Sequence, residues 1–173
     1  MITEKLKKLI KKEQLKNVHF DPILPYKLKK EGKNENKKVK NISLLLRHDI
    51  QNTPLKELLK HKSLDFTVDS LKVVDDYLDR IRKRKKLISE EEIKIIILRC
   101  GAYLGEVIRR KAPREFIWVS YGVATSLDKS ITKLQKSLLT HITLYEIKEK
   151  RFWFHFNKVH KFLEYGRGDN LWS

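Results

Sequence analysis

Glu106 is the residue whose neighbours suggest the most specific chemistry. Arg109 and Arg110 follow it by three and four residues, a spacing that brings side chains together on one helix. One interpretation is a helix-surface ion pair. The other is a carboxylate held by arginine in the cleft of a small enzyme, beside Trp118 on a predicted strand. Because no second carboxylate or histidine lies near Glu106 in the sequence, these residues do not make up a catalytic set.

A run of cations ends a predicted helix and is the most basic segment of the chain. It comprises Arg80, Arg82, Lys83, Arg84, Lys85 and Lys86. Positive charge at the C-terminal end of a helix is favourable because it opposes the helix dipole, so the run has a local structural reason. The same cations are available to an acidic molecule. We therefore take these six residues as the candidate partner-binding site.

Other motifs that carry chemistry are absent from the sequence. His141, His155 and His160 do not have the spacing of two histidines one helical turn apart that binds zinc in metalloproteases. Residues 101–106 contain two glycines but lack the Lys-Ser/Thr end of a phosphate-binding loop. We therefore expect no metal and no cofactor, and the sequence identifies no small-molecule ligand.

Length and composition favour one ordinary domain with an acidic partner. The 173 residues carry 39 Lys and Arg against 22 Asp and Glu, a formal net charge of +17, of which residues 1–86 hold +12. Only 10 of the basic residues are arginine, which argues against base-specific reading of DNA. The chain has neither a membrane-spanning apolar run nor a secretory signal core, so we expect a cytoplasmic protein. Delivery by a specialised secretion system stays open.

The first third of the chain is predicted to be an arm. Lys27–Asn41 holds seven Lys and two Glu with glycine and asparagine between them, and its only apolar side chains are Leu28 and Val39. Such a composition is typical of a mobile loop. We therefore expect a basic helical arm at residues 1–63, with this Lys-rich loop at 27–41, ahead of a compact domain at residues 64–173.

Helical periodicity marks four segments. Ile2–Lys16 has an apolar stripe bordered by lysines, which indicates a helix that packs on the protein's own core or, as a less favoured alternative, lies on an anionic membrane surface. Pro54 suggests the first turn of a helix that continues to about Lys62. A third helix follows from about Thr67. Ser89 then opens a capping box and a fourth helix.

The helix that begins at Ser89 has a broad apolar face. Cys100 lies within that face, so we expect a buried and unreactive thiol. Gly101 and Gly105 stand at its edge, and each costs up to about 1 kcal/mol against alanine in a helix. We expect another segment to pack closely against these two glycines, and room for a ligand is the alternative.

The last third of the chain changes to the periodicity of strands. Residues 116–121, 141–147 and 151–156 are rich in aromatic and β-branched side chains, which predicts three strands of an antiparallel sheet. Asn157 is a candidate N-cap for a short final helix that ends at Gly166. The fold class is therefore α+β, with N-terminal helices, a central antiparallel helix pair, a small antiparallel sheet and a short C-terminal helix.

The second half of the chain also resembles an uncharacterised family of small bacterial proteins. The resemblance rests on the helix sequence GAYLGEVIRR at residues 101–110, on Trp118 in the strand that follows, and on KVHKFLEYGRGDNL at residues 158–171. It implies a bacterial, cytoplasmic domain of an accessory or immunity type. It transfers no catalytic residue.

These observations lead to three hypotheses about function. The first is a non-enzymatic bacterial interaction protein whose basic residues bind an acidic macromolecule, with an acidic protein surface as the expected partner. The second is non-specific binding of nucleic acid through the basic N-terminal half. The third is a small enzyme with a cleft near Glu106.

Overall fold

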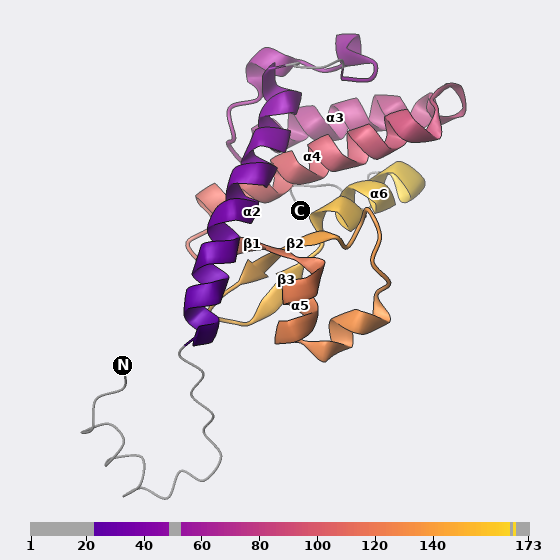
Figure 1. The fold of residues 1–173 in the computed structure, drawn as a ribbon. Helices are drawn as coiled ribbons and strands as arrows, with labels where there is room; N and C mark the ends of the chain where they lie inside the picture. Colours follow the sequence, from indigo (N-terminus) through magenta and orange to yellow (C-terminus); the bar gives the residue numbers. More distant parts are fainter. Residues whose placement is uncertain (1–22, 49–52, 167, 169–173) are drawn as a thin grey trace, which may run out of the picture.

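The computed structural model describes residues 23–48, 53–166 and 168, with five α-helices and three strands in that part of the chain (Figure 1). The helices are α2 (Ile23–His48), α3 (Ser70–Lys83), α4 (Glu90–Lys111), α5 (Tyr121–Leu127) and α6 (His155–Tyr165), and the strands are β1 (Phe116–Ser120), β2 (Ile142–Glu146) and β3 (Arg151–Trp153). The expected α+β class is confirmed. The helix predicted at residues 2–16 lies outside the described residues.

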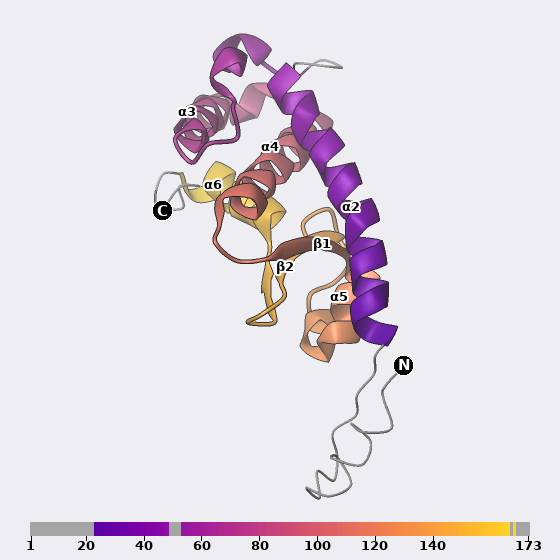
Figure 2. The same ribbon diagram turned by 90° about the vertical axis from the view of Figure 1, so that its left-hand side faces the viewer.

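The Lys-rich segment 27–41 is helical, so the prediction of a loop there was wrong. It forms the middle of α2, which packs along α4 and β1 (Figure 2). Val39 and Leu46 of this helix are buried in the main hydrophobic cluster together with side chains of α3, α4 and α6. Burial of this thin apolar stripe stabilises a helix whose composition alone resembles a linker. Residues on both sides of the expected boundary between 63 and 64 therefore belong to the same hydrophobic cluster.

The segment after Pro54 is also different from its prediction. Instead of a helix through Lys62, two 3-10 turns form, η1 (Lys56–Leu58) and η2 (His61–Ser63). Leu55 adopts a left-handed backbone conformation with φ 47°, which ends any α-helix at that residue. The carbonyl of Pro54 accepts a hydrogen bond from the buried Tyr77 hydroxyl at 2.5 Å, so the segment is tied to α3.

The antiparallel helix pair α3 and α4 agrees with the sequence analysis. The Ser89 capping box is present, since the Ser89 amide donates to the Glu92 carboxylate at 2.9 Å and the Glu92 amide donates to Ser89 Oγ at 3.3 Å. The two helices are joined through the turn η3 (Lys85–Leu87). At the other end of the pair, the hydroxyls of Ser70 and Tyr103 lie 2.6 Å apart.

The sheet has the order β1-β2-β3, and both pairings are antiparallel, with Trp118 opposite Leu144 and Tyr145 opposite Phe152. Both faces of β1 are buried. Trp118 faces the main cluster, while Ile117 faces a second one. The third strand is shorter than predicted, because α6 already begins at His155 and Asn157 lies inside it rather than at its N-cap.

Candidate functional site

Glu106 is the centre of a buried polar cluster. Its side chain is fully inaccessible to solvent, and its carboxylate accepts five hydrogen bonds. Arg109 donates from Nε at 2.7 Å and from Nη2 at 3.0 Å, and Arg110 donates from Nε at 3.2 Å and from Nη2 at 3.0 Å. The indole Nε1 of Trp118 donates the fifth, at 3.0 Å. The structure thus brings together the four residues assigned to a possible cleft.

The charges of this cluster keep the carboxylate ionised. Burial alone raises the pKa of Glu106, but hydrogen bonds from Arg109 and Trp118 and the positive charges of both arginines outweigh it, so the pKa is below its ordinary value. A general acid needs a raised pKa and access to substrate, and this carboxylate has neither. Its hydrogen bond from Trp118 connects α4 to β1.

The two glycines of α4 allow close packing. A Cβ on Gly105 would lie 2.2 Å from Cζ2 of Trp118, and one on Gly101 would lie 2.5 Å from Cδ1 of Phe156. Aromatic rings from β1 and α6 therefore fill both positions, as the packing interpretation predicted. Glu106, Arg109, Arg110 and Trp118 line neither of the two hollows described below.

Cys100, His155 and His160 have different surroundings in the structure. Cys100 is fully buried, which confirms the predicted burial, and this burial raises the pKa of its thiol and so disfavours the reactive thiolate. His155 is buried against the ring of Trp118. His160 lies 3.8 Å from the carboxylate of Glu164. Within residues 23–48, 53–166 and 168, no three His, Cys, Asp or Glu side chains are grouped so that they could hold a metal ion.

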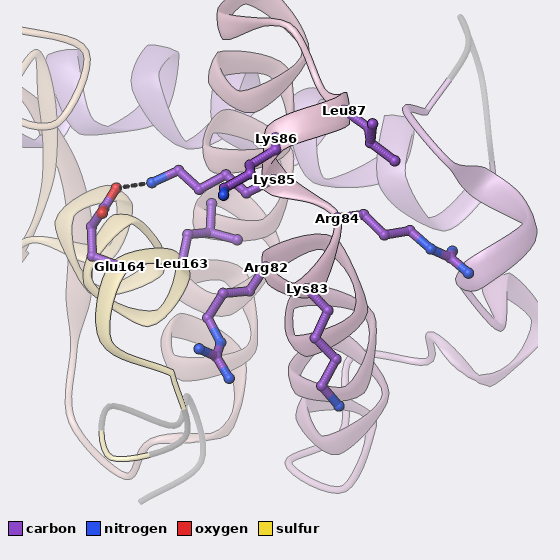
Figure 3. Close-up of a pocket in the computed structure, with 8 residues that line it drawn as sticks. All are labelled: Arg82, Lys83, Arg84, Lys85, Lys86, Leu87, Leu163 and Glu164. Carbon is purple, nitrogen blue, oxygen red and sulfur yellow. Dashed lines mark hydrogen bonds and ion pairs between the residues drawn. The ribbon is translucent and has the colours of Figure 1, made fainter.

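The basic run lines a hollow at the turn between α3 and α4, with Lys85 and Lys86 on the side of Glu164 and Arg84 on the opposite side (Figure 3). The hollow has a volume of about 550 Å³ and is lined by Arg82, Lys83, Arg84, Lys85, Lys86, Leu87, Leu163 and Glu164. Five of the six predicted binding residues thus come together. Arg80 does not line the hollow, and its Nη1 donates instead to the carbonyl of Leu58 at 3.4 Å.

The cations around the hollow differ in their pairing. Asp79 lies 3.4 Å from Arg82 and 2.8 Å from Lys83, and Lys85 pairs with Glu164 of α6. Arg84 and Lys86 are exposed, and neither forms an ion pair with a residue that the structure describes. These two cations are therefore the ones most available to an acidic ligand.

Three residues of the hollow were missed by the sequence analysis. Leu87 has 86% of its surface exposed, which is unusual for a leucine between two helices. The sequence contains a usable signal, since Leu87 is an apolar residue directly after the basic run, but the charges alone defined the predicted site. Leu163 and Glu164 come from α6 and reach the hollow only through the packing of α6 against α3.

A second hollow shares Lys85 with the first. Its volume is about 480 Å³, and its lining is mainly apolar, from α4 and from the turn at residues 137–139. Nothing in the local pattern of the sequence connects those two segments.

Comparison of the chain with protein-family models, with curated proteins and with solved structures finds no match. Among the described residues, each helix is too short or too polar to span a bilayer.

Proposed function

We propose that this protein is a non-enzymatic interaction protein that binds an acidic partner protein through the basic surface formed by Arg82–Leu87. The resemblance to small bacterial proteins adds an accessory or immunity-type role to this proposal. The observation that carries it is the pair of exposed cations Arg84 and Lys86 at the edge of a hollow, neither of which forms an ion pair within the described part of the chain. Such groups attract an acidic surface and accelerate its association.

The exposed Leu87 favours a protein over a nucleic acid at this surface. A phosphate backbone needs cations but gains nothing from an apolar side chain at their centre. Protein interfaces, by contrast, commonly have an apolar centre with a polar rim. Leu87 is 86% exposed and lies in the same turn as Arg84 and Lys86, so an apolar group stands within a rim of cations (Figure 3).

A charge reversal tests the proposal. The probe is a fluorescein-labelled peptide of glutamate and leucine residues, titrated by fluorescence anisotropy. We expect the double variant Arg84→Glu, Lys86→Glu to weaken binding about tenfold or more and to reduce its salt dependence, because two attractive charges become repulsive.

The matched control is Lys129→Glu, Lys133→Glu, which makes the same change of net charge on exposed lysines of η4 (Lys129–Lys133), away from the hollow (Figure 1). The control should bind the peptide almost as well as the original chain. Equal weakening by the two double variants would mean that only overall charge matters, and the surface assignment would then be incorrect.

A second candidate function, binding of a nucleic-acid backbone, is favoured by α2. Exposed lysines line the outer side of this helix, namely Lys29, Lys30, Lys33, Lys37 and Lys40. Both of its glutamates are occupied elsewhere, since Glu31 accepts from Ser120 Oγ of β1 and the buried Glu35 pairs with Lys38. At 1.5 Å per residue, the lysine row extends for roughly 16 Å, a length that spans several phosphates of a duplex.

Salt dependence tests this second function. The variant Lys29→Gln, Lys33→Gln, Lys37→Gln should reduce the slope of log K against log salt by up to about 3 for a mixed-sequence DNA duplex, because each lost contact releases fewer counterions. The control Lys129→Gln, Lys133→Gln, Lys136→Gln removes the same charge from another exposed segment. Weak binding without any salt slope in the original chain would exclude the function.

A further inference from the structure

The second hollow has apolar walls that come from two distant parts of the chain. Ile88, just before α4, and Ile93 and Ile97 of α4 line it from one side, and Leu138 and Leu139 line it from the other. The polar members of its lining are Lys85, Glu90, Lys94, Ser137 and His160. The floor is therefore apolar, with the cations Lys85 and Lys94 and the carboxylate of Glu90 among the groups at its edge.

The turn that carries the two leucines is held in place by its own hydrogen bonds. The Ser137 amide donates to Thr140 Oγ1 at 2.9 Å, and Thr140 Oγ1 donates to the carbonyl of Gln135 at 2.8 Å. The His141 amide donates to the carbonyl of Ser137 at 2.9 Å. Because this turn is fixed, the leucines are presented toward α4 before any ligand arrives, which lowers the entropic cost of binding.

The two hollows meet at Lys85, which lines both of them. Its ammonium group pairs with Glu164, and Glu164 in turn lies beside His160 of the second hollow. These three side chains thus separate a basic hollow from an apolar one. A ligand that covers both must present acidic and apolar groups next to each other.

We infer that the apolar hollow binds the apolar side chains of the same partner, and that the partner segment is an acidic amphipathic helix. This inference rests on the proposed function of the basic surface. An amphipathic helix places apolar residues at i, i+3, i+4 and i+7 on one face and charged residues beside them. Its apolar face would lie against Ile93, Ile97 and Leu138. Its acidic flank would meet Lys86, which points to the same side as the shared Lys85 in Figure 3, and its end would reach Arg84 across the turn.

Two designed peptides of equal composition test the inference. Both are about 18 residues long and contain only glutamate and leucine. In the first, leucines occupy i, i+3, i+4 and i+7 positions, and in the second, the same residues are scrambled so that no apolar face forms. We expect the amphipathic peptide to bind about tenfold more tightly, and to shift the methyl NMR signals of Ile93, Ile97 and Leu138.

A variant of the hollow provides the matching protein change. Leu138→Ala, Leu139→Ala removes two partly buried side chains that pack against the main hydrophobic cluster, so a thermal unfolding curve first checks that the variant is folded at the assay temperature. It should weaken binding of the amphipathic peptide about tenfold and leave the salt dependence unchanged, because no charge is altered. The control is Leu134→Ala, which removes a leucine that is 43% exposed and lies outside both hollows.

The outcomes separate the inference from the proposed function. In one outcome, both peptides bind equally, the Arg84→Glu, Lys86→Glu variant weakens their binding, and the leucine variant has no effect. This outcome supports an acidic partner and refutes the amphipathic helix. If neither peptide binds, the basic surface does not recognise acidic protein segments and both proposals fail.

Discussion

The carboxylate of Glu106 is a buried charge whose cost is offset by the groups around it. Moving a charged carboxylate out of water is costly, and only well-placed hydrogen bonds and countercharges offset that cost. Arg109, Arg110 and Trp118 provide both. Arg110 continues the cluster, because its guanidinium lies 3.7 Å from the centre of the Phe66 ring.

His155 gives the protein a specific sensitivity to acid. Burial lowers the pKa of His155 from 6.5 to about 3, and the backbone of Trp153 counteracts only part of this shift. In the unfolded chain the imidazole takes up a proton near pH 6.5, while in the folded chain it stays neutral. The stability that depends on the neutral form is therefore complete above pH 6.5 and falls as the pH is lowered toward 3.

We predict that the free energy of unfolding falls by about 2 kcal/mol between pH 7 and pH 5 because of His155. The depressed pKa of Glu106 adds a further loss only below about pH 4.5, its ordinary value. Urea denaturation at the two pH values measures the effect. The variant His155→Met should remove it, whereas His160→Met, at a partly exposed position of the same helix, should retain it. A stability that does not change over this range contradicts the prediction.

Among the elements, α2 has the largest difference between expectation and structure. Gly32 and Asn36, two of the residues that suggested a loop, are contact points with the sheet. Gly32 lies so close to β1 that an added Cβ would be 3.1 Å from Cβ of Ile117. Asn36 Oδ1 accepts a hydrogen bond from the Trp118 amide at 2.9 Å, so α2 covers the outer edge of β1.

A pair of asparagine variants tests this role of α2. Asn36→Ala should destabilise the protein by about 1–2 kcal/mol, because the Trp118 amide loses its acceptor at a partly buried position. Asn34→Ala makes the same substitution on the exposed side of the same helix. It should change stability by only a few tenths of a kcal/mol, or slightly increase it, because alanine favours helix. Equal effects in thermal or chemical unfolding would refute the edge contact.

The paired helices α3 and α4 behave as their sequences predict. Their apolar residues recur every three or four positions, and Ser89 marks the start of α4 with a capping box. Local signals of this strength do not depend on distant parts of the chain. They position the basic turn, but they do not show that α6 lies beside it.

In the whole molecule, the two candidate binding surfaces lie on opposite sides. Figure 1 shows α2 along one side of the fold, while the turn between α3 and α4 is at the other. Variants of Arg84 and Lys86 and variants of the α2 lysines therefore act on separate surfaces. Because the two surfaces are far apart in the described fold, the two sets of experiments can be interpreted independently.

The sequence by itself determined the α+β class, the helix pair, the three strands in outline and the buried state of Cys100. These features follow from periodicity, capping and polarity within a short window of chain. Only the tertiary structure decided that residues 27–41 are helical, that Trp118 donates to Glu106, and that Leu163 and Glu164 complete the basic hollow. The reason is physical: each of these depends on contacts between residues far apart in sequence, and no local pattern carries information about which distant surface will bury them.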